Sequence, residues 1–356
     1  MDTQWKFYLD SSSAWEAMLF EIEQAKTSIK LEQFILETDT IGQKFLTALK
    51  NKAKEGLKVE VILDSAGSIN YYTSSLWRDL SAENIQIVFF NTLLPWSIGS
   101  HSSWFFRDHR KLLIIDSKVA FTGGICLGDE MKNWRDTHVR IEGRMIEQME
   151  FLFERMKNRA EKKTPHSEKK LPVILGNLNY ISNSPLPKRR YLYYRLVEAM
   201  RSAKKSILIT TPYFVPDRRI LRILKLAKRK NVVVKIILPE ASDHPLVDFA
   251  AQSFFSELLK NEVQIFQYKN KMMHSKTVIV DEDWTTVGSL NIDNISLRYN
   301  FEANIVSTER EFNLELKKHF EDDLKNSIEV TLPDWEKRLL PRKLLEFFAR
   351  ILSPLL

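Results

Sequence analysis

The residue types that could do chemistry occur twice, in the same order and at the same spacing. Each set has a histidine, a lysine two residues later, an aspartate five residues after the lysine and a glycine seven residues after the aspartate. The two sets are His109, Lys111, Asp116 and Gly123, and His274, Lys276, Asp281 and Gly288. A lone histidine is more often a structural residue than a catalytic one. Because the whole pattern recurs after 165 residues, we interpret both sets as functional.

Two histidines and two lysines brought together would form a site for phosphodiester chemistry. A neutral imidazole can attack phosphorus and form a covalent phosphohistidine, and a protonated imidazole can give its proton to the leaving oxygen. Histidine has an unperturbed pKa of about 6.5, so both forms are accessible near neutral pH. The lysines would hold the phosphate oxygens. They would also repel a cation, and the other histidines lack the spacing of metal ligands, so we expect neither a metal nor another cofactor.

The strands that carry these residues decide where the side chains point. Side chains two residues apart in a strand share a face, so each histidine should project with its lysine. The apolar runs 112–115 and 277–280 are typical of buried strands. Asp116 and Asp281 lie at an odd spacing from the lysines and should leave that face. We therefore expect both aspartates to hold the turns after the strands, or to support the site, rather than to contact substrate.

The rest of the chain repeats around these motifs. The sequence AKTSI at 25–29 recurs as AKKSI at 203–207, and in each copy an apolar strand, a helical pattern and a second apolar strand follow. Strands that alternate with helices predict an α/β unit. Two such units agree with a length of 356 residues at about 150 residues per domain. We place a first repeat at 1–155, a basic linker at 156–190, a second repeat at 191–330 and a basic amphipathic helix at 331–356.

Positive charge is concentrated in one segment. The chain has 53 Lys and Arg against 46 Asp and Glu, a net charge of +7. Residues 155–190 alone contain ten basic and two acidic side chains, together with four prolines. This segment is either a solvated linker or a surface that attracts a membrane or a nucleic acid. The one cysteine, Cys126, excludes an internal disulfide and a zinc site built from cysteines.

Two segments could contact a membrane, and no segment is predicted to span one. No apolar run reaches the roughly 18 residues of a membrane-spanning helix, and the N-terminus has no apolar core of a secretory signal. Residues 341–352 predict a helix with one apolar arc and one charged arc, which either packs on the protein or lies in a membrane interface. The apolar arc contains Leu344, Leu345, Phe347, Phe348, Ile351 and Leu352. Residues 89–98 and 104–106 are rich in Phe, Leu and Trp, and we expect them to line an acyl-chain groove or enter the bilayer.

The duplicated pattern HxKxxxxD resembles the hallmark of the phospholipase D superfamily, and within it the chain is most similar to bacterial cardiolipin synthases. The similar stretches are RDHRK (107–111), GGICLGDE (123–130), WRDTH (134–138), GSLN (288–291), NFE (300–302) and LSPLL (352–356). The resemblance implies two phospholipase-D-like α/β sandwich repeats related by a pseudo-twofold axis, with one active site at their interface. It also implies a peripheral protein on the cytoplasmic face of a bacterial inner membrane.

The same resemblance implies roles for individual residues. His109 would be the nucleophile and His274 the general acid, although this order differs between members of the superfamily. The residues that would hold phosphate oxygens are Lys111, Lys276 and Asn291. Glu302 would orient His274, and Asp136 would orient His109.

Two positions depart from the family pattern. Cys126 stands where the first repeat of the family has asparagine, and a thiol is a weak hydrogen-bond donor. We expect Cys126 to be a small buried residue without a redox role. Ile295 stands where many members have arginine, and we expect that position to be structural.

The resemblance implies a phosphatidyltransferase that makes cardiolipin from phosphatidylglycerol at an anionic membrane surface, through a phosphatidyl-histidine intermediate. A phospholipase D-type hydrolase and a metal-independent nuclease are alternatives that would use the same two histidines. The apolar segments favour lipid over nucleic acid. A lipid-binding scaffold without activity is a further alternative, which the two intact HxK pairs disfavour.

Overall fold

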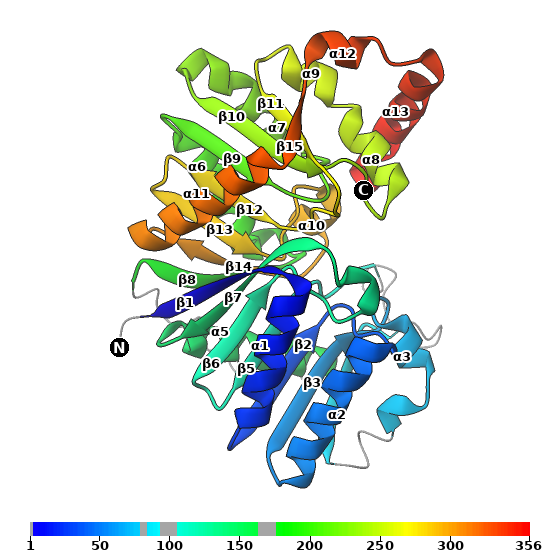
Figure 1. Cartoon of the computed structure of the whole chain (residues 1–356), viewed down its shortest axis with the longest axis vertical. Helices are drawn as coiled ribbons and strands as arrows, with labels where there is room; N and C mark the ends of the chain where they lie inside the picture. Colours follow the sequence, from blue (N-terminus) through cyan, green and yellow to red (C-terminus); the bar gives the residue numbers. More distant parts are fainter. Residues whose placement is uncertain (1–2, 79–83, 93–104, 163–175) are drawn as a thin grey trace. The chain divides into compact units, whose positions relative to one another are not determined.

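The computed structural model of the protein describes residues 3–78, 84–92, 105–162 and 176–356. The chain divides into two compact units (Figure 1). The first unit comprises Met1–Ser182 and Asn300–Ala303, and the second comprises Asn183–Tyr299 and Asn304–Leu356. Four residues that follow the second motif in sequence therefore belong to the first unit.

The first unit is built on a seven-stranded sheet in the order β1-β7-β6-β5-β2-β3-β4. Neighbours among β2, β3 and β4 are parallel, and the other neighbours are antiparallel. The strands are β1 (Gln4–Asp10), β2 (Ser28–Gln33), β3 (Lys58–Asp64), β4 (Ile85–Phe90), β5 (Leu112–Ile115), β6 (Val119–Gly123) and β7 (Arg135–Glu142). The helices are α1 (Ser11–Gln24), α2 (Thr40–Lys54), α3 (Ile69–Thr73), the 3-10 helix η2 (Asp129–Met131) and α5 (Met145–Ala160).

Helices α1 and α2 cover one face of this sheet, and α5 lies on the other. Met18 of α1 and Phe45 of α2 share a hydrophobic core with Leu31 of β2 and Leu113 of β5. On the opposite face, Lys30 of β2 forms an ion pair of 3.0 Å with Glu150 of α5. Alternate residues of β2 therefore point to different layers, as a strand requires.

The second sheet has the order β15-β11-β10-β9-β12-β13-β14-β8. Its strands are β8 (Leu178–Asn183), β9 (Ser206–Thr210), β10 (Val233–Pro239), β11 (Gln264–Tyr268), β12 (Thr277–Val280), β13 (Trp284–Gly288), β14 (Glu302–Ser307) and β15 (Ser327–Val330). The α-helices are α6 (Tyr191–Ser202), α7 (Arg218–Ala227), α8 (Pro245–Gln252), α9 (Phe255–Leu259), α10 (Asn294–Arg298), α11 (Arg310–Lys325), α12 (Leu332–Glu336) and α13 (Leu340–Leu352). The 3-10 helices are η3 (Pro187–Arg189), η4 (Lys228–Lys230) and η5 (Ser353–Leu355).

The two sheets repeat one strand order. The run β7-β6-β5-β2-β3-β4 of the first sheet corresponds to β14-β13-β12-β9-β10-β11 of the second, which adds β15 at its edge. The predicted α/β repeat is therefore confirmed. The predicted buried strands are β5 and β12, in which every residue is buried. Each His-Lys pair immediately precedes one of these interior strands, so its backbone is held from both sides.

Asp116 and Asp281 hold chain reversals, as their spacing predicted. The carboxylate of Asp116 accepts the backbone N–H groups of residues 26–28 at 2.7–3.0 Å, and that of Asp281 accepts those of residues 204–206 at 2.7–2.8 Å. Burial raises the pKa of each carboxyl group, but the backbone donors outweigh it, so each pKa lies below its ordinary value. Each aspartate thereby ties the end of a motif strand to the start of the neighbouring strand.

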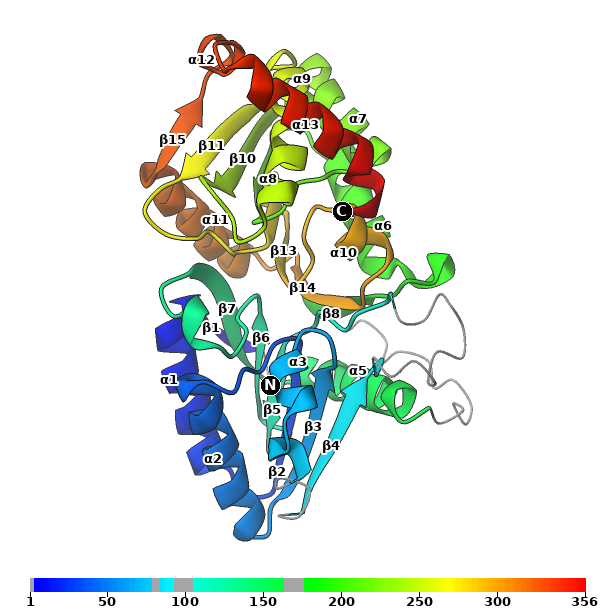
Figure 2. The same cartoon turned by 90° about the vertical axis from the view of Figure 1, so that its right-hand side faces the viewer.

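Helix α13 lies at the surface of the second unit (Figure 2). Its large apolar side chains are exposed, whereas its side toward the protein carries a buried carboxylate. Glu346 and Ala349 are buried. Glu346 accepts three hydrogen bonds from Arg338 at 2.7–3.1 Å, and Arg350 pairs with Glu257 of α9 at 3.0 Å. The exposed large apolar side chains on α13 are Leu340, Leu344, Leu345, Phe347, Phe348, Ile351 and Leu352. The predicted arcs are thus confirmed, and the alternative in which the apolar arc packs on the protein is wrong.

The other predicted surface segments are described in part. Residues 156–160 of the expected linker continue α5, and 178–183 form β8, whereas 163–175 lie outside the described residues. Phe89 and Phe90, which we expected to contact lipid, belong to β4, and Phe90 is buried against Phe301 at 5.4 Å between ring centroids. The remainder of that apolar segment, 93–104, also lies outside the described residues. Among the helices of the described residues, none is long and apolar enough to cross a membrane.

Replacing Asp281 by Asn should lower the free energy of unfolding by about 1–2 kcal/mol at neutral pH, because an amide oxygen accepts backbone hydrogen bonds more weakly than a carboxylate. The folded pKa of Asp281 is depressed, so its contribution is present above the unfolded pKa and is lost as the pH falls through the folded pKa. Urea unfolding of D281N and the unsubstituted protein should therefore converge in acid. D283N, in an exposed residue of the same turn, is the control. Equal losses in both variants would contradict the assignment.

Candidate active site

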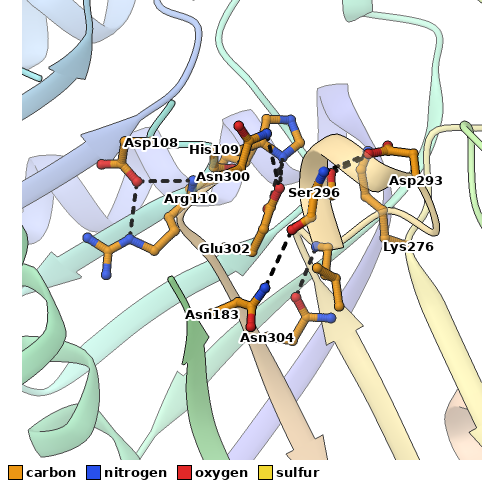
Figure 3. A network of polar contacts seen from close by, with 12 residues as sticks. Asp108, His109, Arg110, Asn183, Lys276, Asp293, Ser296, Asn300, Glu302 and Asn304 are labelled. Carbon is orange, nitrogen blue, oxygen red and sulfur yellow. Dashed lines mark hydrogen bonds and ion pairs between the residues drawn. The ribbon is translucent and has the colours of Figure 1, made fainter. Parts of the chain in front are cut away.

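In the first unit His109 contacts the carboxylate of Glu302 (Figure 3). It also contacts an aromatic ring. Its Nδ1 atom is 3.0 Å from both carboxylate oxygens of Glu302. Its ring packs edge-on to Phe34 with 4.8 Å between ring centroids. Both His109 and Glu302 are buried. An Nδ1–H group that donates to Glu302 leaves the imidazole lone pair on Nε2, which is therefore the nitrogen suited to attack an electrophile.

Backbone pairing brings Glu302 to this position. The N–H group of His109 donates to the carbonyl of Phe301 at 3.0 Å, and the N–H group of Phe301 donates to the carbonyl of Arg107 at 2.9 Å. Glu302 is the first residue of β14, directly after this pairing. Asn300 adds a longer hydrogen bond of 3.4 Å from its Nδ2 atom to the Glu302 carboxylate.

The predicted partner of Glu302 was wrong. The family resemblance assigned Glu302 to His274 as the acidic residue of a following strand, and it assigned Asp136 to His109. The structure instead places Glu302 against His109, because residues 300–303 belong to the first unit. Asp136 is buried in β7, where its Oδ1 atom accepts the N–H group of Thr137 at 2.7 Å.

Gly124 has a steric role beside Asp136. A Cβ atom at position 124 would lie 2.2 Å from Asp136 Oδ1, so a side chain there would displace the carboxylate. Gly124 therefore leaves room for an acidic side chain, a reason that the motif pattern alone did not reveal.

Lys111 is fully buried below His109. Its Nζ atom donates to the His109 carbonyl at 2.6 Å and lies 5.2 Å from the centroid of Phe34. The contact of both motif side chains with Phe34 agrees with the prediction that they share a face. Thr122 of β6 donates to the Lys111 carbonyl at 2.9 Å. The ammonium group is thus a fixed positive charge in a site of low water content, where it acts strongly on an anion.

The second motif repeats this arrangement in the second unit. His274 and Lys276 are both buried, and Lys276 Nζ donates to the His274 carbonyl, as Lys111 does to that of His109. The ring of Tyr213 packs edge-on to His274 with 6.4 Å between ring centroids. The Tyr213 hydroxyl donates to Asp243 at 2.6 Å. Each unit therefore carries one histidine against an aromatic ring with a lysine fixed beneath it.

Asn291 and Cys126 occupy equivalent places in the two repeats. The residues that follow them form the equivalent bridges Leu36–Leu127 and Phe214–Ile292. Cys126 is buried in the core of the first unit, which confirms that it is a small buried residue. Asn291 is buried too, and its Oδ1 atom has no hydrogen-bond partner among the described residues. The second repeat therefore retains an amide that the first repeat lacks at this position.

Sequence reasoning missed the buried charges that hold the first motif. Asp64, the last residue of β3, accepts the N–H group of Asp108 at 2.9 Å, and Arg107 lies 3.4 Å from its carboxylate. Burial outweighs these interactions and raises the pKa of Asp64 to about 6. An aspartate at the carboxyl end of an apolar strand was the signal that could have identified it.

Arg110 fixes the motif from the opposite side. It forms ion pairs with Glu32 of β2 and with Asp108, the latter at 3.2 Å. Burial raises the pKa of Glu32 well above its ordinary value, although the charge of Arg110 opposes this. The charged residue inside the apolar run of β2 was a signal of this interaction. Together, Asp64 and Arg110 fix the backbone on both sides of His109.

Comparisons with known proteins identify the family to which the chain belongs. Residues 18–157 and 196–324 match the family described as "Cardiolipin synthase, PLD-like domain". Cardiolipin synthase of Clostridium perfringens (strain SM101 / Type A) is 36% identical over 367 residues, which cover 98% of this chain and 76% of that protein. Cardiolipin synthase 1 of Bacillus cereus is 32% identical over 378 residues, which cover 99% of this chain and 73% of that protein.

A solved structure shows the same fold. The phosphatidylserine synthase of Haemophilus influenzae Rd KW20 superposes with a TM-score of 0.78 at 15% sequence identity, and the match covers 99% of this chain and 95% of that one. At this identity the likeness concerns the fold alone. The sequence matches carry the family assignment. The chain therefore belongs to the cardiolipin synthase family, whose domains are phospholipase D-like.

Proposed function

We propose that the protein is a phosphatidyltransferase that converts two molecules of phosphatidylglycerol into cardiolipin and glycerol. The observation that carries this proposal is the His109–Glu302 pair above the buried Lys111, in a chain related to proteins named cardiolipin synthase. That pair provides a nucleophilic nitrogen with a fixed tautomer. The adjacent lysine provides positive charge where a phosphate gains negative charge during the reaction.

In the first step, Nε2 of His109 attacks the phosphorus of one phosphatidylglycerol. The bond from phosphorus to the head-group oxygen breaks, and glycerol leaves with a proton supplied by His274. The phosphatidyl group is now bound to Nε2 of His109. The carboxylate of Glu302 stabilises the positive charge of the substituted imidazole, to which its contact with Nδ1 is suited.

In the second step, a hydroxyl group of another phosphatidylglycerol attacks the same phosphorus. His274 accepts the hydroxyl proton, the phosphorus–nitrogen bond breaks, and cardiolipin forms with His109 restored. Two displacements at one phosphorus exchange the head group without a net change in the number of phosphodiester bonds. A water molecule in place of the hydroxyl would give phosphatidic acid, so water exclusion decides between transfer and hydrolysis.

The remaining predicted site residues bind the phosphate or hold the catalytic groups in place. Those that we propose to hold phosphate oxygens are Lys111, Lys276 and Asn291. Asp136 stands in β7 where Glu302 stands in β14, and we propose that it orients His274 as Glu302 orients His109. Asp116 and Asp281 act from a distance through the turns described above.

A phospholipid substrate places the enzyme at a membrane, and we propose that α13 is the lipid-contacting surface. Phe347 and Phe348 are 60% and 61% exposed, and five other large apolar side chains of the helix are exposed with them. Two charged residues of the same helix, Glu346 and Arg350, form ion pairs with Arg338 and Glu257 of the protein body. A helix whose apolar side faces outward fits the boundary between head groups and acyl chains. The excess of basic residues favours an anionic surface, such as the cytoplasmic face of a bacterial membrane.

The direct test is mass spectrometry of lipids after the purified protein is added to phosphatidylglycerol vesicles without added metal. Cardiolipin and free glycerol are the expected products, with H109A as the inactive control. Phosphatidic acid instead would identify a hydrolase. Unchanged lipid together with cleavage of DNA would identify a nuclease and overturn the proposal.

Replacing Glu302 by Gln should lower the rate of cardiolipin formation by about 10²–10⁴-fold, because a neutral amide does not stabilise a positively charged imidazole. The change keeps the size of the side chain, so the melting temperature serves as the check on folding. E329Q changes an exposed carboxylate on β15 and should leave the rate unchanged. If E302Q retained the full rate, Glu302 would have no part in the reaction.

The double variant F347S/F348S should bind anionic vesicles at least 10-fold more weakly, because each buried phenylalanine contributes about 1.5–3 kcal/mol. Flotation with phosphatidylglycerol vesicles measures the binding. The control is I328S, since Ile328 of β15 is similarly exposed but lies off α13. The rate of cleavage of a soluble short-chain phosphodiester should be the same in F347S/F348S, I328S and the unsubstituted protein. Equal vesicle binding by the double variant and I328S would exclude α13 as the lipid-contacting surface.

A further inference from the structure

Gln33, the last residue of β2, is a buried amide whose polar atoms are not satisfied. Its side chain is 1% exposed. Neither Oε1 nor Nε2 has a hydrogen-bond partner within the described parts of the chain. Buried polar groups in folded proteins are nearly always paired, and an exception requires water, an ion or a ligand at that point. Gln33 was not among the site residues that the motifs predicted.

The strand register places Gln33 beside the first motif. In the antiparallel pairing of β2 and β5, Leu31 opposes Leu113 and Glu32 opposes Leu112. The next pair along this register is Gln33 and Lys111. Residues directly opposite in such a pair have Cβ atoms about 4.5–5.5 Å apart and share a face of the sheet. Gln33 therefore lies on the face that carries His109 and Lys111.

The residue after Gln33 supports this location. The ring of Phe34 contacts the imidazole of His109 at 4.8 Å and the Nζ atom of Lys111 at 5.2 Å. The carboxyl end of β2 is therefore packed against the reactive pair. A polar group at this end of the strand lies within the site that the two motif side chains form.

The residue equivalent to Gln33 in the second repeat has a different side chain with its own hydrogen-bond partners. The AKTSI and AKKSI sequences align Gln33 with Thr211. The hydroxyl of Thr211 donates to the Tyr213 carbonyl at 2.9 Å and accepts the N–H group of Ile292 at 3.3 Å. The Thr211 hydroxyl therefore already has hydrogen-bond partners within the protein. The amide near the motif in this repeat is that of Asn291. The first repeat has Cys126 at the place of Asn291, and it has the unsatisfied amide of Gln33 instead.

We propose that Nε2 of Gln33 donates a hydrogen bond to a non-bridging phosphate oxygen beside Lys111, in place of the amide that Cys126 does not supply. An amide N–H is a good donor to an anionic oxygen, whereas a thiol is a weak one. The identity of the phosphate as part of a phospholipid rests on the proposed function. The assignment of Gln33 as a phosphate-binding residue rests on burial, register and the exchange between the repeats.

The test is Q33M, which keeps the length of the side chain and removes both polar atoms. We expect kcat/KM for cardiolipin formation to fall about 10- to 100-fold, the effect of one hydrogen bond to a charged group. The melting temperature should stay the same or rise, because an unsatisfied amide is replaced by an apolar group. The matched control is Q148M. Gln148 is a buried glutamine of α5 whose Oε1 accepts the N–H group of Tyr180 at 2.8 Å. Q148M should lower the melting temperature and leave kcat/KM within about twofold.

The double variant Q33M/C126N tests the exchange itself. An asparagine at position 126 returns an amide to the place of Asn291 and should recover a large part of the lost kcat/KM. A purely structural role for Gln33 would give a different pattern. In that case Q33M would have both a lower melting temperature and a lower kcat/KM, and adding C126N would restore neither. That result would overturn the proposal.

Inorganic phosphate separates this proposal from the proposed function. We expect phosphate to raise the melting temperature of the unsubstituted protein and of Q148M, and to raise that of Q33M much less. If the unsubstituted protein made no cardiolipin but this difference persisted, the phosphatidyltransferase proposal would fail and the role of Gln33 would stand. An unchanged kcat/KM and an unchanged phosphate response in Q33M would overturn the role of Gln33 alone.

Discussion

The contact between Glu302 and Nδ1 of His109 is the interaction on which the rest of the site depends. A buried carboxylate is costly unless it is paired, and here it is paired with an imidazole that must carry positive charge during the reaction. The pair fixes the tautomer and orientation of His109 together. The polar groups nearby then have defined tasks, because Lys111 lies beneath the ring and Phe34 covers its edge.

Buried charged side chains around the short, fully buried strand β5 hold the first motif in position. Asp64 holds the backbone before His109, Arg110 is held between Glu32 and Asp108, and Asp116 closes the turn beyond β5. Each of these groups uses its charge on backbone N–H groups or on an opposite charge. Moving any one of these groups would break several interactions at once. His109 is therefore held in position before substrate binds.

The sequence predicted the architecture and the motif residues because both follow from local rules. Alternation predicted β5 and β12, parity predicted that Asp116 and Asp281 serve the turns, and the repeat predicted two α/β units. The pairing of Glu302 was wrong because four residues cross from one repeat to the other unit, and no local rule encodes such an exchange. Gln33 was missed because a polar residue at the end of an apolar strand resembles an ordinary strand terminus. Its unsatisfied amide becomes visible only in the packed structure.

The transfer of residues 300–303 to the first unit has a consequence for the origin of the duplicated chain. One repeat on its own would carry its histidine without the carboxylate that orients it, because that carboxylate is at the start of the other repeat's strand. A single-repeat ancestor could therefore complete the pair only by association of two copies. Gene fusion would then have made that association permanent. Once fused, the two copies were free to diverge, as the unlike residues Cys126 and Asn291 record.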